Sequence, residues 1–500
     1  MPSSSIKKIL VANRGEIALR ILRTAREMGI QTVAVYSEAD RSFPHVAYAD
    51  QAVCIGPAAS KDSYLRGDKI IEVAKQLHVD AIHPGYGFLS ENADFSQAVT
   101  DAGLIFIGPT AASIRLMGDK ISAKQTVKAR QVPLVPGVDE AISDRNVAKK
   151  IAQEVGFPIL IKASAGGGGK GMRVVSNLDE FDGQMDRAIS EAVQAFGDGA
   201  VFIEKYITVP RHIEIQILAD QHGHVVHLFE RECSIQRRHQ KLVEEAPSAV
   251  LSPELRDAMG KCAVEVAKAC GYAGAGTVEF ILDENKNFYF LEMNTRLQVE
   301  HPVTECITGL DLVKEMIHIA EGKPLSFTQE DIQMRGHAIE LRICVEDPYT
   351  NFLPDIGRLT TYRRPQGHGI RVDDGIEEGM DIPIHYDPMI AKLIVHADSR
   401  EAAILKLKRA IQDFSIEGVK TTLPFGTFVL EHEAFLSGDF DTRFVDLYFK
   451  DKQEPIPAAQ STAGILAALI ATEIQKKSQK NRMPYPVINQ GISAWKSKRS

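Results

Sequence analysis

A ten-residue run near position 300 carries polar side chains at alternate positions. The polar members of the run are Glu292, Asn294, Arg296, Gln298 and Glu300. Alternate side chains of a strand share one face, so an extended run would line up carboxylates, amides and a guanidinium. The run follows an apolar strand at 288–291, and polar groups beside a buried strand are costly unless something pairs with them. We therefore interpret the run as a binding or catalytic face, in preference to a structural network of ion pairs.

A second acid, Glu279, lies on the preceding predicted strand. The segments 274–282 and 288–294 flank a polar turn, which predicts a β-hairpin. If the turn spans Glu284 to Asn287, Glu279 pairs with Glu292 on the same face. A turn one residue longer or shorter would put the two acids on opposite faces, unless a bulge corrects it. Two facing carboxylates and an amide suit Mg²⁺ or Mn²⁺ shared with nucleotide phosphates.

Four consecutive glycines lie between two predicted strands, within the stretch AGGGGKGMRVV at 165–175. Such a tip can bring backbone N–H groups against phosphate oxygens, because no Cβ atom blocks the approach. Lys162 and Lys170 would add positive charge. The stretch lacks the spacing of a Walker A loop. A disordered linker is the alternative, but a linker would not lie between strands rich in Ile and Val, so we predict a phosphate lid.

Further charged residues are candidates for the same nucleotide site. Glu204 and Lys205 end a predicted strand at 201–207, where the backbone could contact an adenine edge. A basic cluster at 237–241 is interpreted as an anion site, with a solvated surface as the alternative. Lys120, near the start of a predicted helix at 118–130, would by itself be interpreted as solvated.

The order of elements indicates how these residues are positioned. Strand 6–12, helix 15–29 and strand 31–36 predict a parallel βαβ unit, and the alternation continues to residue 108. Its first turn, Asn13 to Gly15, lacks the G-x-G-x-x-G pattern, so a dinucleotide site is disfavoured. The alternation at 211–220 predicts a half-buried antiparallel strand.

The last third of the chain predicts a separate α+β region. A strand at 336–346 carries Arg342 on the same side as Glu340. From residue 451 the composition becomes linker-like, and apolar residues at helical spacing over 461–474 predict a peripheral helix that docks on a partner or on the body.

The bulk composition excludes several classes of protein. With 500 residues and a net charge of −8, we expect two to four soluble domains and no nucleic-acid partner. The six cysteines include no C-x-x-C pair, which argues against a zinc site or a disulfide framework. There is no apolar signal segment, and the longest apolar stretch, 463–471, is too short to cross a membrane. We therefore expect a cytoplasmic protein.

Six motifs together resemble the signatures of the biotin carboxylases, in the same order and over roughly residues 5–450. The motifs are ILVANRGEIALRI, HPGYGFLSEN, IKASAGGGGKGMRVV, RECSIQRRHQKLVEEAP, TVEF and EMNTRLQVEHPVTE. The resemblance implies an ATP-grasp fold of the α/β and α+β classes. It implies an N-terminal α/β domain at 1–115, an ATP-grasp domain at 116–335 with a mobile lid at about 133–203, a C-terminal domain at 336–450 and a linker with a helical tail at 451–500.

The resemblance also implies a role for each motif residue. The implied ATP contacts are Lys120, Lys162, Gly166, Gly167, Gly168, Gly169, Glu204, Lys205, His212, Gln236 and His239. The implied ligands of two Mg²⁺ or Mn²⁺ ions are Glu279, Glu292 and Asn294. Bicarbonate would contact Arg296, Gln298 and Val299, with Glu300 as its base, ionised beside Arg296. Lys241 would lie near the reacting phosphate, and Arg342 would stabilise the enolate-like oxygen of biotin.

The implied reaction carboxylates a biotin attached to a partner protein. Relatives that carry their own biotin do so on a Met-Lys motif, and this sequence contains no Met-Lys pair. We therefore expect a separate biotin carboxyl carrier protein, carboxyltransferase subunits and, from the family, a homodimer. The leading hypothesis is the biotin carboxylase subunit of acetyl-CoA carboxylase, in fatty acid synthesis. The alternatives are the same subunit of a two-chain pyruvate, propionyl-CoA or other acyl-CoA carboxylase, another ATP-grasp ligase, and a non-enzymatic nucleotide-binding regulator.

Overall fold

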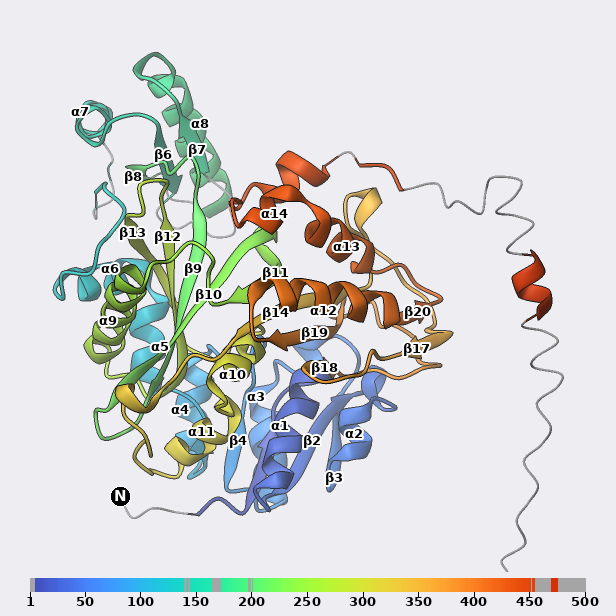
Figure 1. Ribbon diagram of the computed structural model, residues 1–500. Coiled ribbons are helices and arrows are strands. Elements are labelled where there is room, and N and C mark those ends of the chain that lie inside the picture. Colours follow the sequence, from blue (N-terminus) through green and yellow to red (C-terminus); the bar gives the residue numbers. More distant parts are fainter. Residues whose placement is uncertain are drawn as a thin grey trace, which may run out of the picture. The chain divides into compact units, whose positions relative to one another are not determined.

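The structure is a computed structural model of the chain. It describes residues 5–138, 142, 144–163, 172–196, 199, 201–450, 452–454 and 469–474. The chain divides into one compact unit over residues 1–450 and a second over 451–500 (Figure 1). Residues 469–474 of the second unit are helical, and the rest of the predicted helix at 461–474 lies outside the described residues.

The first part of the compact unit is a parallel sheet in the order β3-β2-β1-β4-β5. Its strands are β1 (Lys8–Val11), β2 (Gln31–Ser37), β3 (Gln51–Gly56), β4 (Ala81–His83) and β5 (Ile105–Phe106). The helices between them are α1 (Gly15–Glu27), α2 (Pro44–Tyr48), α3 (Gly67–Gln76) and α4 (Ala93–Asp101). Helix α1 buries Ile17, Ile21 and Leu22 at helical spacing, as the sequence predicted. The predicted parallel α/β arrangement is confirmed.

The turn before α1 is held by contacts within the protein. The Asn13 side-chain amide donates to the backbone oxygens of Pro84 and Tyr86 at 2.7 and 2.8 Å. Arg14 pairs with the buried Asp40 at 2.7 Å. These contacts engage the side chains of Asn13 and Arg14 at the position where open α/β sheets bind ligands.

A small antiparallel sheet, β7-β6-β8, lies in the segment predicted as a lid. It consists of β6 (Ile159–Ala163), β7 (Met172–Val175) and β8 (Val201–Lys205), and it packs against α7 (Arg145–Val155) and α8 (Leu178–Phe196) (Figure 1). Its core includes the fully buried Ile159, Ile161 and Phe181. The glycines at 166–169 lie outside the described residues, between the ends of β6 and β7.

The large antiparallel sheet runs in the order β13-β12-β9-β10-β11-β14-β19-β18. Its strands are β9 (Arg211–Ala219), β10 (Val225–Arg237), β11 (Gln240–Ala246), β12 (Gly274–Leu282), β13 (Phe288–Asn294), β14 (His337–Cys344), β18 (Ile370–Asp374) and β19 (Met389–Ala397). The sheet joins segments far apart in the sequence. It therefore brings the run that begins at Glu292 and the strand of Arg342 into one framework.

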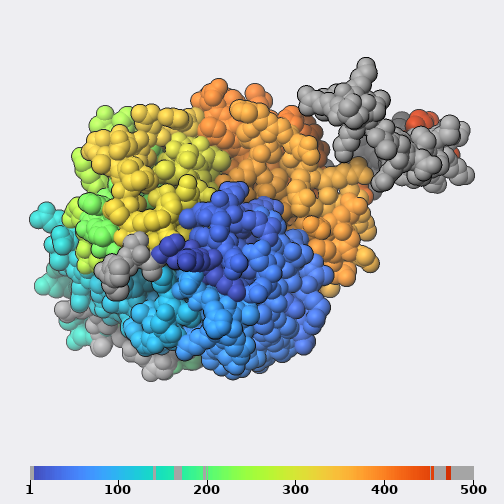
Figure 2. Space-filling view, turned by 90° about the horizontal axis from the view of Figure 1, so that it is seen from below, coloured from blue at the N-terminus to red at the C-terminus, as the bar shows by residue number. Residues whose placement is uncertain are grey.

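Helices cover this sheet and link it to the N-terminal part. They include α5 (Ala111–Gly118), α6 (Lys120–Lys128), α9 (Pro253–Ala269), α10 (His301–Thr308), α11 (Leu312–Ala320), α12 (Arg400–Asp413), α13 (Leu423–Glu431) and α14 (Glu433–Ser437). Helix α1 contacts α11 and β18. Figure 2 shows the same neighbourhood, with the blue N-terminal segment against yellow and orange surfaces.

Strand β9 differs from its prediction. The alternation at 211–220 predicted a half-buried strand, yet both faces of β9 are buried, and Glu214 and Gln216 are fully inaccessible. The polar face is covered because the fully buried Arg231 of β10 donates to Glu214 Oε1 at 2.5 Å and to Gln216 Oε1 at 2.7 Å. A strand with an alternating pattern can thus be buried on both sides when its polar face meets other polar side chains.

Glu232 of β10 gives a prediction about pH and stability. Burial raises the pKa of this carboxyl to about 7, although the Arg211 charge and the hydroxyls of Ser234 and Ser248 oppose the change. Between about pH 4.5 and 7, the folded protein therefore holds a proton on Glu232 that the unfolded chain has released. The free energy of unfolding falls as the pH rises through this range. We expect Glu232→Gln to be more stable than the parent by about 3 kcal/mol at pH 8, and equal to it below pH ~4.5.

Urea unfolding of both proteins at several pH values measures this difference. The matched control is Glu284→Gln, which changes an exposed acid in the β12–β13 turn and should show no such trend. A constant difference between Glu232→Gln and the parent across pH 4 to 8 would contradict the assignment.

Candidate active site

The β12–β13 hairpin sets Glu279 opposite Glu292, as predicted, but by a different route. Leu282 pairs with Phe288, so the turn covers residues 283–287 and is one residue longer than the predicted turn. The register shifts between Glu279 and Phe280, which leaves Leu291 unmatched on β13. This bulge restores the pairing of the two acids.

The hairpin presents hard oxygen ligands along one edge. Asn294 donates its amide to Glu279 Oε1 at 2.9 Å, and Glu292 is exposed. Desolvation beside the sheet raises the pKa of Glu292, the facing charge of Glu279 raises it further, and Lys120 opposes the change. Lys120 itself is exposed at the first turn of α6. Two carboxylates and an amide oxygen at this spacing fit the ligand preference of Mg²⁺ or Mn²⁺.

Lys241 lies at the centre of a buried charge cluster. Its ammonium is 2.6 Å from Glu300 Oε1, 3.0 Å from Glu279 Oε1 and 2.5 Å from Glu214 Oε2. Burial alone would lower the pKa of Lys241, but the three carboxylates hold it well above its ordinary value. Lys241 therefore stays charged and connects Glu279 of the β12–β13 hairpin to Glu300.

Glu300 lies between two cations. Arg342 donates to Glu300 Oε2 at 2.9 Å, whereas Lys241 contacts the other carboxylate oxygen, Oε1. Burial would raise the pKa of Glu300, but Lys241, Arg342 and then Arg231 hold it well below its ordinary value. The carboxylate is fully inaccessible and ionised, so it is a base whose strength depends on where its two partner cations point.

Arg342 also pairs with a second carboxylate, that of Glu244. Its Nε donates to Glu244 Oε1 at 2.6 Å, and burial raises the pKa of Glu244 to about 7. Glu340 lies two residues earlier on β14, on the same side of the strand as predicted, and pairs across the sheet with Glu244. The guanidinium is thus fixed in a largely dry environment.

The prediction for Arg296 is corrected by the structure. Arg296 donates to Glu91 Oε2 at 2.7 Å and to Asn294 Oδ1 at 3.1 Å, so its carboxylate partner is Glu91 rather than Glu300. Glu91 lies in the loop after β4, at a sequence separation of 205 residues. The same acid accepts from the Thr295 backbone at 3.1 Å, which anchors the segment where the chain leaves β13.

The segment from 295 to 300 is a loop, so the extended geometry of the polar run ends at Asn294. The backbone leaves the sheet after Asn294 and enters α10, with Pro302 in the first turn. The Gln298 side chain is buried, and its backbone oxygen is 2.8 Å from His301 Nδ1. Val299 is half-buried, and its backbone oxygen accepts from Lys392 at 2.8 Å.

The predicted nucleotide residues form two groups. Glu204 pairs with both Lys162 and Lys124, while Lys205 donates to the carbonyls of Gly156 and Phe157 at 2.9 Å. This first group lies on the small sheet and on α6.

The second group follows the large sheet. His212 Nε2 is 3.0 Å from Glu279 Oε2, which links it to the β12–β13 hairpin. Gln236 is buried and lies opposite Lys241 in the register of β10 with β11. His239 is exposed in the β10–β11 turn, with φ of 68°. The predicted anion cluster at 237–241 is therefore divided between a buried lysine and an exposed turn.

Sequence reasoning missed several members of the cluster. They are Glu91, Lys124, Glu214, Arg231, Glu244 and Lys392. Two carried a readable signal, since Lys124 lies one helical turn after Lys120 and Glu214 shares the face of His212. Among the described residues, His212, Glu214 and Glu279 form one group whose ligand atoms lie within 4.8 Å of one another.

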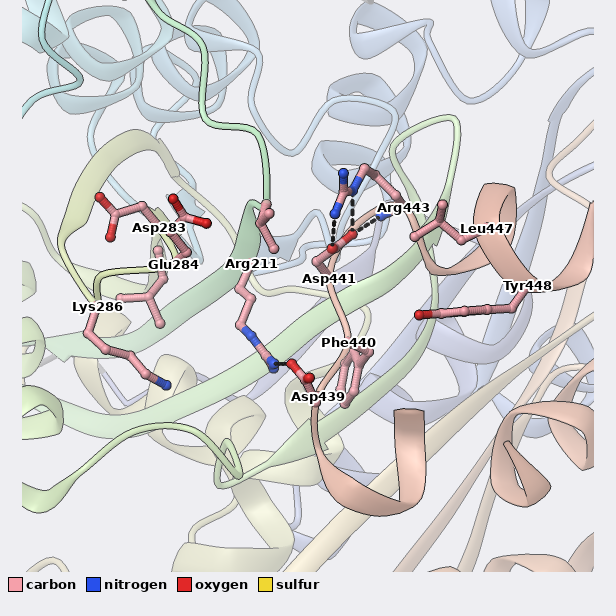
Figure 3. Close-up of a pocket in the computed structure, with 12 residues that line it drawn as sticks. Arg211, Asp283, Glu284, Lys286, Asp439, Phe440, Asp441, Arg443, Leu447 and Tyr448 are labelled. Atoms are coloured by element: carbon pink, nitrogen blue, oxygen red, sulfur yellow. Dashed lines mark hydrogen bonds and ion pairs between the residues drawn. The ribbon is translucent and has the colours of Figure 1, made fainter. Parts of the chain in front are cut away.

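A separate cavity of about 410 Å³ lies beside this region (Figure 3). It is lined by Arg211, Asp439 and Asp441 among others, and Arg211 faces away from the adjacent His212 because neighbours on a strand alternate. Figure 3 shows Arg211 against Asp439 and Arg443 against Asp441, and these pairs measure 3.4 and 2.6 Å. Charges that pair in this way are typical of a structural surface.

Three protein families match the chain in succession. Residues 5–114 match the biotin carboxylase N-terminal domain, and residues 340–447 match the biotin carboxylase C-terminal domain. Between them, residues 119–328 match the ATP-binding domain of the carbamoyl-phosphate synthase L chain. None of the helices described in the structure is both long and apolar enough to cross a membrane.

Relatives and solved structures agree with these matches. The chain is 54% identical over 444 residues to biotin carboxylase 1 of Bacillus subtilis, covering 89% of this chain and 99% of the relative. It is 53% identical over 466 residues to a pyruvate carboxylase subunit of Methanothermobacter thermautotrophicus, covering 91% of this chain and 95% of that relative.

A solved structure gives the same answer. The biotin carboxylase domain dimer of 2-oxoglutarate carboxylase from Hydrogenobacter thermophilus, in complex with MgADP, ADP and bicarbonate, matches with a TM-score of 0.82 and 49% identity, over 89% of this chain and 98% of that one. The predicted ATP-grasp fold is thereby confirmed. The chain belongs to the biotin carboxylase family.

Proposed function

We propose that the chain catalyses the first half-reaction of a biotin-dependent carboxylase. The γ-phosphoryl group of ATP passes to bicarbonate to form carboxyphosphate and ADP, and the carboxyl group then passes to N1′ of biotin on a carrier protein, with release of phosphate. The observation that carries the proposal is the position of Glu300, an ionised carboxylate that contacts Lys241 and Arg342. Glu300 lies in the loop directly after the β12–β13 hairpin, which carries Glu279, Glu292 and Asn294. A base between two cations suits the deprotonation and use of a small anion.

Bicarbonate activation is assigned to the loop after β13. Arg296, Gln298 and Val299 would bind the anion, and Glu300 would take its proton. The two cations that depress the pKa of Glu300 also limit its basicity. Basicity rises when Lys241 turns toward a phosphate and Arg342 toward biotin, because each move removes a positive charge from the carboxylate. Substrate binding would thus raise the strength of the base at the time it is needed.

The nucleotide residues position phosphate for transfer. Lys120, Lys162 and the glycines at 166–169 would contact the phosphates, with Glu204, Lys205, His212, Gln236 and His239 around the rest of ATP. The donor set of Glu279, Glu292 and Asn294 fits two Mg²⁺ or Mn²⁺ ions, which would neutralise phosphate charge. Support comes from the similar 2-oxoglutarate carboxylase domain, which was solved with MgADP and bicarbonate.

The biotin end of the site is assigned to Arg342. Its guanidinium is anchored by Glu244 through Nε, and the remaining donors of the planar fork, released from Glu300, could stabilise the enolate-like oxygen of biotin as N1′ attacks carbon. Carboxyphosphate hydrolyses readily in water, so a closing lid at about 133–203 would protect it.

For the complete enzyme we propose acetyl-CoA as the acceptor, with carrier and carboxyltransferase partners and a homodimer of this chain. Pyruvate is the second candidate, because the match with the pyruvate carboxylase subunit of Methanothermobacter thermautotrophicus covers 91% of this chain and 95% of that relative. Purification of the chain with its native partners, followed by transfer of labelled bicarbonate to acetyl-CoA, propionyl-CoA or pyruvate, distinguishes these acceptors.

The half-reaction is tested by ATP turnover. We expect phosphate release that depends on bicarbonate and rises when free biotin is added. Omission of bicarbonate is the control for contaminating ATPase activity. Turnover that is indifferent to biotin but responds to another acceptor would refute the proposal.

A further inference from the structure

Lys392 of β19 is fully buried beside the proposed site. In the sheet it pairs with Arg342 on β14 and with Asp373 on β18, so the three side chains form a row on one face. Its exposed fraction is 0%, which is unusual for a lysine and requires partners for the ammonium. Lys392 lies outside the six sequence motifs and outside the groups assigned above to ATP, metal, bicarbonate and biotin.

The partners of Lys392 come from three segments of the chain. Its ammonium donates to the Val299 backbone oxygen at 2.8 Å and lies 3.2 Å from Glu16 Oε1, while Asp373 is at 4.0 Å. Glu16 belongs to the first turn of α1 and also accepts a hydrogen bond from the Tyr86 hydroxyl. Lys392 thus ties β19 to α1 and to the loop that enters α10.

The contact with Val299 matters because of the peptide it holds. The Val299 carbonyl and the Glu300 N–H belong to the same planar peptide group. A donor that fixes this oxygen therefore fixes the plane from which the Glu300 side chain leaves the backbone. We propose that Lys392 is a positioning residue of the carboxylation reaction, which aims the Glu300 carboxylate by holding the peptide between residues 299 and 300.

This inference rests on the proposed function, since Glu300 is taken as the base. It adds a requirement on the C-terminal part of the chain. Strand β19, which pairs with the strand of Arg342, would also orient the loop proposed to bind bicarbonate. It would do so through Lys392, whose side chain contacts neither bicarbonate nor biotin. An ammonium is suited to this task because its hydrogen bond to a carbonyl is charge-assisted.

The test is Lys392→Met, which keeps the length of the side chain and removes the ammonium. We expect kcat for biotin-dependent turnover to fall roughly 10- to 100-fold, as for the loss of a hydrogen bond to a charged group, while the KM for ATP is unchanged. The matched control is Lys406→Met, because Lys406 of α12 also donates to a backbone oxygen, that of His396, at 2.6 Å.

A second variant covers the case in which Lys392→Met fails to fold. Glu16→Gln combined with Lys392→Met removes both members of the closest ion pair, so Glu16 is not left as a buried charge without its partner, and Asp373 keeps Arg371 at 2.6 Å. Thermal melting establishes folding, and kcat with the KM for ATP is measured for both variants.

Each outcome decides the inference. A lower kcat with an unchanged KM for ATP supports the positioning role. A folded variant with wild-type kcat overturns it, and so does a loss of folding in both variants, because Lys392 would then be purely structural. A parent protein without bicarbonate- and biotin-dependent turnover would refute the proposed function itself, whereas an active parent with an unaffected Lys392→Met refutes this inference alone.

Discussion

Glu300→Gln is expected to lower biotin-dependent turnover by a factor of about 10²–10⁴, the usual contribution of a general base. The amide keeps the shape of the side chain but has no basic oxygen to accept the proton of bicarbonate. Lys241 keeps Glu214 and Glu279 as partners, and Arg342 keeps Glu244, so the buried cations remain paired. The fold and the binding of ATP should therefore survive.

The measurement is steady-state phosphate release with bicarbonate and free biotin, together with equilibrium binding of ATP. Glu315→Gln is the control, because it changes a half-buried glutamate on α11 outside the cluster. Biotin-dependent turnover close to that of the parent would show that Glu300 is not the base.

The second large effect is expected for Glu292→Lys. Glu292 is exposed, so the change should not disturb the core. The new ammonium would face Glu279 across the hairpin, pair with it and occupy the position of a cation. Because a metal ion contributes several kcal/mol to phosphoryl transfer, metal-dependent turnover of ATP should fall by roughly three orders of magnitude.

Titration with Mg²⁺ and Mn²⁺ measures this loss. Glu284→Lys makes the same change of charge in the turn of the same hairpin and should leave the metal dependence intact. If Glu292→Lys responds to metal as the parent does, the ligand assignment is wrong.

Features that depend on local pattern could be predicted from the sequence. The parallel sheet follows from alternating strands and helices. The pairing of Glu279 with Glu292 follows from a period of two and a turn signal. The hairpin pairing depends on residues within about fifteen positions of one another, and each βαβ unit depends on consecutive elements, so backbone geometry limits the possibilities.

Features that depend on strand order could not be predicted. Lys241 meets carboxylates from β9, β12 and the loop after β13, and no spacing in the sequence indicates that β11 lies within reach of all three. The sequence suggested the nearby Glu300 as the partner of Arg296. Its partner is instead Glu91, which lies 205 residues away in the sequence. Long-range ion pairs of this kind become visible only once the sheet is assembled.

Leu291 has no pairing partner on β12, so the β12–β13 hairpin contains one residue more than the alignment of its two acids requires. Because the bulge takes up one residue, the length of the turn is uncoupled from the alignment of Glu279 with Glu292. Deletion of Leu291 would straighten the strand and leave both acids on the same face, so metal-dependent turnover should largely persist. Deletion of Met293 instead makes Glu292 and Asn294 adjacent and turns them to opposite faces. The hairpin should therefore tolerate the loss of Leu291 before Glu292, but not the loss of Met293 after it.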